Sequence, residues 1–208
     1  MYKLYWAQGS GAMAPQALFE EIGVEYEKII IDIEKEEHKS EEFLSVNPMG
    51  QIPALVLPDG TLMTETAAML AHIVDRYPEA KLAPPAGSAD SARFLRWLFF
   101  LGSNVYPAIL RVYYSERYST DPTAAEGIKG AAESELDEQF KILDDALDPG
   151  PYLVGEAFSA VDILLWMLIQ WHPDPARMFE EAPRIKRFSG LLQARPAIAR
   201  TWREHEED

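Results

Sequence analysis

The spacing of hydrophobic residues changes character about eighty residues into the chain. Before that point, short apolar or alternating runs predict strands at residues 2–6, 26–31, 52–57 and up to Met63. Apolar residues at helical spacing predict helices between and after these strands, at 12–22, 39–46 and 66–77. The first eighty residues therefore predict a compact mixed sheet with helices.

The second part of the chain shows only the helical period. Helices are predicted at 91–117, 122–147, 161–171, 182–194 and 197–204. Ser159 followed by Asp162 forms an acidic variant of the capping box, which marks a helix start. We expect an α/β domain at 1–80, a linker rich in Pro, Ala and Gly at 81–90, and an all-α domain at 91–208.

Charge and composition narrow the classes of partner. The net charge of −15 disfavours nucleic acid and anionic membranes as partners. The apolar runs are too short to span a bilayer and the first residues do not form a signal peptide, so we expect a soluble, cytoplasmic protein. The chain contains no cysteine, so the protein supplies no sulfur nucleophile of its own.

Pro53 stands one residue inside an apolar run that otherwise predicts a buried strand. Proline cannot donate a hydrogen bond to a neighbouring strand, so the strand begins at this residue, lies at a sheet edge or serves another purpose. One such purpose is to leave the start of the strand free to bind a ligand.

Five segments in order along the chain resemble those of glutathione transferases. They are NPMGQIPAL at 47–55, TETAAML at 64–70, the proline-rich linker, LVGEAFSAVDILL at 153–165 and RFSGLLQARPAIAR at 187–200. The resemblance covers essentially the whole chain and implies a thioredoxin-like first domain followed by a helical second domain.

The same resemblance implies a site for the tripeptide glutathione. It places a cis peptide bond before Pro53, so that the backbone of Ile52, next to Gln51, is free to pair with an extended ligand. It assigns Glu65 to the amino group and Thr66 to the carboxylate of the γ-glutamyl end. Taken alone, Glu65 and Thr66 also fit an ordinary helix start.

Two residues are candidates for the group that stabilises the glutathione thiolate. Bacterial beta-type members, whose N-terminus this chain most resembles, carry a cysteine where Gly11 stands, and that cysteine is absent. Ser10 occupies the hydroxyl position of the Ser/Thr-type members, although it also fits a helix cap or a turn. Tyr5 is the alternative donor, and strand alternation alone does not show which way it faces.

The remaining candidate residues lie in less distinctive segments. His38 and Lys39 fall where the family often places a cation for the glycyl carboxylate, but their segment also fits a solvated charged surface. The electrophile pocket is expected to use residues that would serve equally well in a helical core: Trp6, Ser103, Asn104, Tyr106, Arg111 and Tyr113.

The sequence thus predicts a detoxifying, homodimeric glutathione transferase that adds the glutathione thiolate to small hydrophobic electrophiles. Glutathione is the co-substrate, and neither a cofactor nor a metal is expected, because the four histidines lack metal-ligand spacing. A glutathione-dependent isomerase, etherase or peroxidase would use the same half-site. The alternative from another class is a non-catalytic ligand-binding or protein-interaction module of the same fold.

Overall fold

A computed structural model describes residues 1–206, and its contacts divide the chain into two compact units. Unit 1 combines Met1–Lys81 with the segment that begins at Gln193, and unit 2 is Leu82–Leu192. The sequence-based division instead assigns everything from residue 91 onward to the helical domain, and its residues 207–208 lie outside the described part. The two divisions differ because hydrophobic spacing locates a helix without showing what the helix packs against.

Unit 1 is built on a four-stranded sheet in the order β2-β1-β3-β4. The strands are β1 (Tyr2–Trp6), β2 (Tyr26–Ile30), β3 (Ala54–Val56) and β4 (Leu62–Met63). β1 pairs parallel with β2 and antiparallel with β3, which in turn pairs antiparallel with β4. Two further elements of this unit are the 3-10 helices Glu37–Lys39 and Pro78–Ala80.

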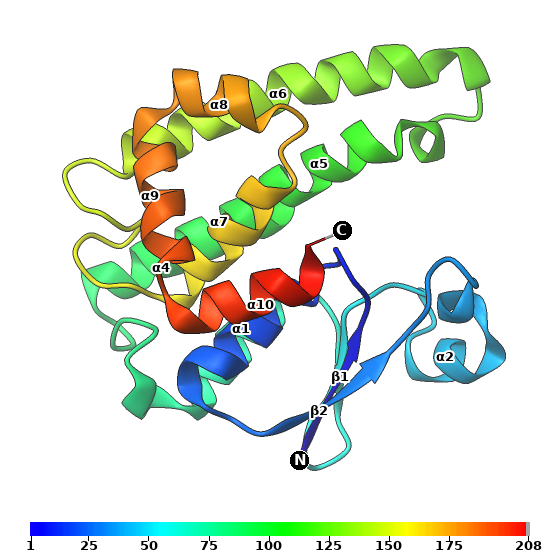
Figure 1. Cartoon of the computed structure of the whole chain (residues 1–208), viewed down its shortest axis with the longest axis horizontal. Coiled ribbons are helices and arrows are strands. Elements are labelled where there is room, and N and C mark those ends of the chain that lie inside the picture. Colours follow the sequence, from blue (N-terminus) through cyan, green and yellow to red (C-terminus); the bar gives the residue numbers. More distant parts are fainter. Residues whose placement is uncertain (207–208) are drawn as a thin grey trace. The chain divides into compact units, whose positions relative to one another are not determined.

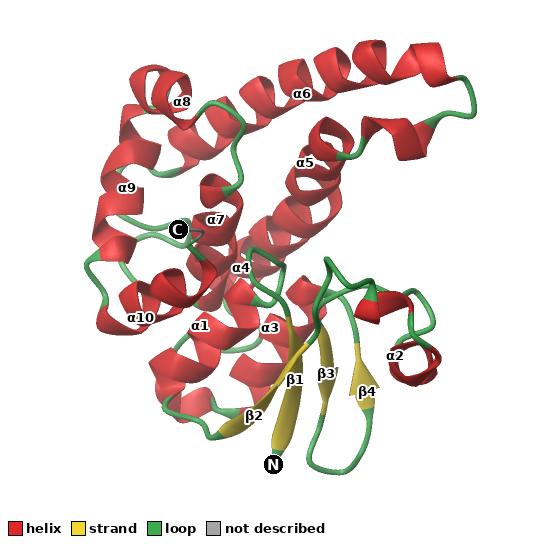
Figure 2. Ribbon diagram, turned by 45° about the vertical axis from the view of Figure 1, so that its right-hand side comes forward, coloured by secondary structure: helices red, strands yellow, loops and turns green. Residues whose placement is uncertain are grey.

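Four α-helices complete unit 1: α1 (Met13–Ile22), α2 (Glu41–Val46), α3 (Thr66–Arg76) and α10 (Pro196–His205). Figure 2 shows α1 and α3 together on one side of the sheet, with α2 apart from them. The burial of β1 alternates, with Leu4 and Trp6 buried and Lys3 exposed, which is the period of a strand with one covered face. The mixed sheet predicted for the first eighty residues is therefore present.

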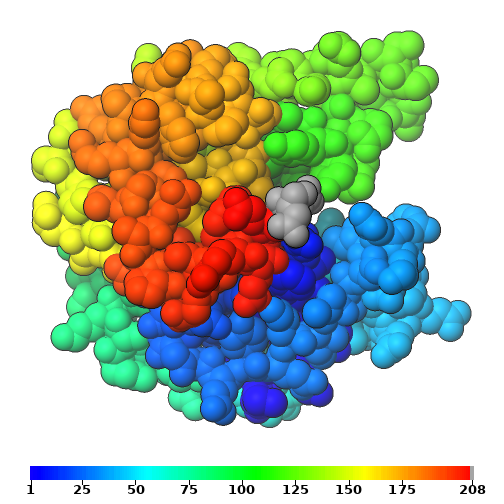
Figure 3. Space-filling model, viewed as in Figure 1, coloured from blue at the N-terminus to red at the C-terminus, as the bar shows by residue number. Residues whose placement is uncertain are grey.

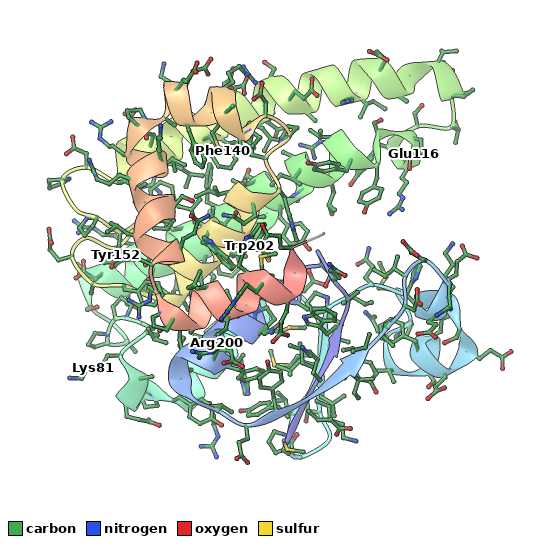
Figure 4. All side chains as sticks on the ribbon, in the orientation of Figure 1. Lys81, Glu116, Phe140, Tyr152, Arg200 and Trp202 are labelled. Atoms are coloured by element: carbon green, nitrogen blue, oxygen red, sulfur yellow. The ribbon has the colours of Figure 1, made fainter. Side chains whose placement is uncertain are left out.

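The last helix packs against the first one. α10 lies alongside α1 (Figure 1), and in the space-filling view its surface meets that of the N-terminal segment (Figure 3). Arg195 donates through Nε and Nη2 to the two carboxylate oxygens of Glu21, at 2.8 Å each. Arg200, labelled in Figure 4, pairs with Glu20 at 3.0 Å. Two ion pairs thus join α10 and its N-cap residue, Arg195, to α1.

The regular elements of unit 2 are helices, and its one isolated β-bridge joins Tyr152 to Gly155. Its α-helices are α4 (Ala89–Phe100), α5 (Tyr106–Tyr113), α6 (Ala125–Ala146), α7 (Ala160–Gln170), α8 (Pro175–Glu181) and α9 (Pro183–Gln193). Two 3-10 helices, Ser115–Tyr118 and Pro122–Ala124, precede α6. Nearly all of α7 is buried, so this helix is the core of the unit. Within the described residues, no helix is both long and apolar enough to cross a membrane.

The helix predicted at 91–117 is interrupted by a π-helical segment, Leu101–Val105, between α4 and α5. The N–H of Tyr106 donates to the carbonyl of Leu101, five residues earlier. Pro107 explains the change, because it has no N–H for the carbonyl of Ser103 and its ring clashes with that carbonyl in an α-helix. One turn of the helix is therefore widened around Ser103 and Asn104.

The start of α7 confirms the cap predicted from Ser159 and Asp162. The buried Asp162 carboxylate accepts hydrogen bonds from the Ser159 N–H at 2.8 Å and from the Ser159 hydroxyl at 2.9 Å. Its other oxygen accepts from the N–H of Leu153 at 2.9 Å. Burial raises the pKa of Asp162 to about 6, while these hydrogen bonds act in the opposite direction. Asp162 therefore joins the loop before α7 to the first turn of the helix.

Candidate functional site

Three segments of unit 1 meet beyond the end of β1. The antiparallel register places Tyr5 opposite Ala54, so Pro53 lies next to the point where β1 leads into the loop 7–12. From the start of α3, the Thr66 hydroxyl donates to the carbonyl of Gly11 at 3.4 Å. The loop after β1, the turn before β3 and the first residue of α3 therefore share one location.

The turn before β3 contains the expected cis peptide bond between Ile52 and Pro53. Asn47, which is 2% exposed, supports this turn: its side-chain nitrogen donates to the Gln51 carbonyl at 2.7 Å. Its side-chain oxygen accepts from the N–H of Met49 at 3.2 Å. Sequence reasoning missed this role, although an Asn between a short helix and a proline is a turn signal.

Glu65 adopts an unusual backbone conformation at the start of α3. Its φ angle is 64°, in the left-handed region that residues with a Cβ seldom occupy. Its side chain is exposed and accepts a 3.4 Å hydrogen bond from the Thr64 hydroxyl, whereas Thr66 is buried. Backbone strain of this kind is concentrated at functional sites, which directs attention to this residue.

Ser10 lies at the end of a tight turn in the loop after β1. Its N–H and its hydroxyl both donate to the carbonyl of Ala7, at 3.3 and 2.7 Å. The hydroxyl oxygen also accepts from the N–H of Ala12, the residue that precedes α1, at 3.3 Å. In this structure the Ser10 hydroxyl therefore forms local hydrogen bonds, as the turn interpretation anticipates.

The two aromatic candidates of β1 make different contacts. The Tyr5 ring packs against Phe43 of α2, with centroids 5.5 Å apart. Trp6 is buried, and its indole N–H donates to Gln16 Oε1 of α1 at 2.6 Å. Trp6 also packs against the ring of His205, at 4.7 Å between centroids. Trp6 thus belongs to the packed interior between β1, α1 and α10, which fits the core interpretation that the sequence also allowed.

The charged candidates for the glycyl end of glutathione lie on the Glu37–Lys39 3-10 helix. Lys39 pairs with Glu36, and both side chains are largely exposed. Nδ1 of His38 is buried and lacks a hydrogen-bond partner among the described residues. Lys39 therefore fits the solvated-surface interpretation better than His38 does.

The candidates for the electrophile pocket, apart from Trp6, all lie in unit 2. Ser103 and Asn104 are exposed on the π-helical segment, where the Ser103 hydroxyl donates to the Phe99 carbonyl at 2.7 Å. The Tyr106 ring meets Trp171 edge to face at 5.3 Å. The Tyr113 hydroxyl donates to the Trp171 carbonyl at 3.1 Å, and burial raises its pKa.

Arg111, the last of these candidates, forms an ion pair with Glu135 of α6. The three candidates on α5, Tyr106, Arg111 and Tyr113, therefore all make contacts within the helical unit. No cluster of three or more His, Asp or Glu side chains suited to a metal ion occurs in residues 1–206.

Comparisons with known proteins identify the family of this chain. The N-terminal domain model of glutathione S-transferases matches residues 1–75, and a C-terminal domain model of the same family matches residues 107–205. A GST-like protein of Escherichia coli K12, YncG, is 30% identical over 99% of each chain. The chain belongs to the glutathione S-transferase family.

Solved structures of this family extend the similarity to the three-dimensional fold. A sphingomonad glutathione S-transferase complexed with glutathione is 31% identical over 98% of each chain, with a TM-score of 0.82. A glutathione transferase homologue from Sulfitobacter with bound glutathione is 26% identical over 96% of each chain, with a TM-score of 0.88. These similarities confirm the predicted family, its two-part fold and the assignment as a glutathione transferase. The roles of individual residues stay predictions.

Proposed function

We propose that unit 1 binds glutathione at the meeting point of the loop 7–12, the Ile52–Pro53 turn and the start of α3. The observation that carries this proposal is the Thr66–Gly11 hydrogen bond, because it joins the residue expected to bind the ligand carboxylate to the loop expected to activate the thiol. The backbone of Ile52 lies beside the same loop through the β1–β3 register.

The γ-glutamyl end of glutathione carries both a carboxylate and an ammonium group, and the start of α3 suits both. The free N–H groups of the helix N-terminus and the Thr66 hydroxyl favour the carboxylate. The exposed Glu65 side chain supplies a negative charge for the ammonium group. The positive φ of Glu65 sets the direction in which its side chain leaves the backbone.

The reaction that we propose is addition of the glutathione sulfur to a small hydrophobic electrophile. The thiol loses its proton to solvent, and the thiolate forms a carbon–sulfur bond. In a substitution the leaving group departs with its electron pair, and in a conjugate addition the resulting carbanion takes a proton from water. Glutathione is a co-substrate in this scheme, and no further cofactor takes part.

We assign stabilisation of the thiolate to Ser10, with Tyr5 as the second candidate. Ser10 precedes the N-terminus of α1, whose dipole favours an anionic sulfur. To donate to the sulfur, the Ser10 hydroxyl must turn away from the Ala7 carbonyl, at the cost of one intramolecular hydrogen bond. Tyr5 ranks second because its ring packs against Phe43.

An ultraviolet difference titration tests this assignment. Thiolate absorbance of glutathione is followed against pH with the wild-type protein and with the variants Ser10→Ala and Tyr5→Phe. We expect bound glutathione to ionise below its free pKa with the wild type and with Tyr5→Phe, but not with Ser10→Ala. If the lowered pKa of bound glutathione persists in Ser10→Ala but is lost in Tyr5→Phe, the role passes to Tyr5. Wild-type protein that binds no glutathione contradicts the proposed function.

The remaining expectations concern the electrophile, the assembly and the location. We propose that residues of unit 2, including Ser103 and Asn104 on the π-helical segment, select the electrophile. A homodimer and a cytoplasmic location likewise stay predictions. Sedimentation analysis of the purified protein tests the dimer, since a monomer at micromolar concentration would contradict it.

A further inference from the structure

The end of α10 contacts the loop expected to activate the thiol. The turn in that loop runs from Ala7 to Ser10, and its two central residues are Gln8 and Gly9. The N–H of Gly9 donates to Nδ1 of His205 at 3.1 Å. The side-chain nitrogen of Gln8 donates to the carbonyl of Glu206 at 2.9 Å. Both central residues of the turn are therefore held from residues 205–206.

His205 is placed to act as a hydrogen-bond acceptor toward this turn. Its side chain is 3% exposed, between Trp6 of β1 and Gln16 of α1. Burial lowers its pKa to about 4, with Glu204 of α10 acting to raise it and Lys28 of β2 acting to lower it. A neutral imidazole has one bare nitrogen, which can accept a hydrogen bond.

The surroundings of the ring favour one tautomer. With Nδ1 bare, the ring accepts from Gly9, and its Nε2–H donates to Gln16 Oε1 at 3.0 Å. The Trp6 indole N–H, 2.8 Å from Nε2, then donates to the same Gln16 oxygen and not to His205. With Nε2 bare, the imidazole accepts only from the Trp6 indole at 2.8 Å. Its Nδ1–H then faces the N–H of Gly9, and neither group has an acceptor there. The Trp6 indole has Gln16 Oε1 as an acceptor in either case. The first tautomer satisfies more of the buried groups.

Gly9 is suited to this contact by its backbone. Its φ angle is 64°, a left-handed conformation that glycine adopts without strain. An added Cβ would meet no atom within 4 Å, so the backbone conformation, rather than lack of space, requires glycine here. Ser10 follows immediately, and its position therefore depends on how this turn is held.

We propose that His205 is a positioning residue of the glutathione site, which holds the Ala7–Ser10 turn through the Gly9 N–H. The catalytic part of this proposal rests on the proposed function, in which Ser10 donates to the thiolate. His205 itself touches neither the sulfur nor the electrophile. Its effect on the reaction passes through the placement of Ser10.

Two substitutions separate the hydrogen bond from the packing of the ring. In His205→Asn, the side-chain oxygen takes the place of Nδ1 and can still accept from Gly9. In His205→Gln, the polar group lies nearer the place of Nε2, so the Gly9 N–H loses its acceptor. Both variants remove the ring, and thermal unfolding of the two shows whether they are folded to the same extent.

The first measurement uses the protein without glutathione. Nitrogen chemical shifts of His205 report the tautomer, and amide hydrogen exchange reports the protection of Gly9. We expect a bare Nδ1, and exchange of Gly9 that is about 3- to 10-fold faster in His205→Gln than in wild type and His205→Asn. A proton on Nδ1, or equal exchange in both variants, overturns the proposal whether or not the protein binds glutathione.

The second measurement adds reduced glutathione, with S-methylglutathione as a probe of binding without a thiol. We expect both variants to bind S-methylglutathione like the wild type, while His205→Gln alone raises the pKa of the bound thiol and lowers kcat about 3- to 10-fold. A bound-thiol pKa unchanged in His205→Gln overturns the positioning role. If wild-type protein binds neither compound, the proposed function fails, and the exchange data alone then decide whether His205 holds the turn.

Discussion

At the scale of single residues, the candidate site depends on groups that are held in unusual ways. Glu65 combines an exposed carboxylate with a left-handed backbone, and the Ser10 hydroxyl, which we propose as the thiolate donor, forms hydrogen bonds inside its own turn. The positive φ of Glu65 costs stability, and the hydrogen bonds of Ser10 restrict the motion of its side chain. Substitutions at this site can therefore change protein stability and glutathione binding independently of each other.

Replacement of Glu65 makes this separation measurable. Glu65→Gly removes the strain of φ 64° and the carboxylate together, whereas Glu65→Ala removes only the carboxylate. In urea unfolding we expect the glycine variant to be more stable than the alanine variant by about 1 kcal/mol. Both variants should lose glutathione affinity, by about tenfold or more. A glycine variant less stable than the alanine variant would show that Glu65 is not strained.

At the scale of elements, α7 illustrates how one buried side chain joins a loop to a helix. Asp162→Ala leaves the N–H groups of Leu153 and Ser159 buried without their acceptor. We expect a loss of about 3 kcal/mol in the free energy of unfolding, measured with urea. Asp145→Ala is the control, because its carboxylate is 72% exposed and should matter by about 0.5 kcal/mol or less. Similar losses in the two variants would contradict the role given to Asp162.

The attachment of α10 to α1 offers a second comparison between buried and exposed charge. The Glu21 side chain is only 11% exposed, so Arg195→Ala leaves a partly buried carboxylate without its bidentate partner. We expect this variant to lose about 1–3 kcal/mol in the free energy of unfolding. Arg200→Ala breaks a more exposed pair and should cost about 1 kcal/mol or less. If Arg200→Ala is the more damaging change, the buried pair is not the main attachment.

The elements themselves could largely be predicted from the sequence. The first strand and the helix beginning at Thr66 occur close to where periodicity predicts them, and the Ser159–Asp162 cap is present. The helix at 175–181 was missed, because seven residues between two prolines carry too little periodicity.

The details that matter most for the site were harder to predict. The positive φ of Glu65 has no sequence signal, since glutamate is not a residue that favours that region. The contact of His205 with Gly9 joins residues 196 positions apart, and no local pattern encodes such a distance. Tertiary packing decides both features.

At the scale of the whole molecule, two buried groups make opposite contributions to the pH dependence of the free energy of unfolding. His205 has its pKa lowered to about 4 from 6.5, so the unfolded chain binds a proton that the folded chain does not, and stability rises with pH across this interval. Asp162 has its pKa raised to about 6 from 3.8, so stability falls as pH rises through this interval. Between about pH 4 and 6 the two contributions largely cancel.

Single substitutions should reveal each contribution. Relative to wild type, His205→Asn should lose stability as pH rises from 4.5 to 6, and Asp162→Asn should gain it, each by about 1–2 kcal/mol. Urea unfolding at several pH values measures both slopes, and the difference from wild type removes the contribution of the other carboxylates. Parallel curves for all three proteins would show that neither group changes its protonation on folding.

The return of α10 to α1 has a consequence for the order in which the protein takes shape during synthesis. Unit 1 is discontinuous, since residues 82–192 are translated between its two parts. The ribosome therefore synthesises every helix from α4 to α9 before it makes α10. Until then, α10 is not available to cover its face of α1, and unit 1 stays incomplete while residues 82–192 are translated. The turn that carries Ser10 therefore receives its contact with His205 only after residues 82–192 have been translated.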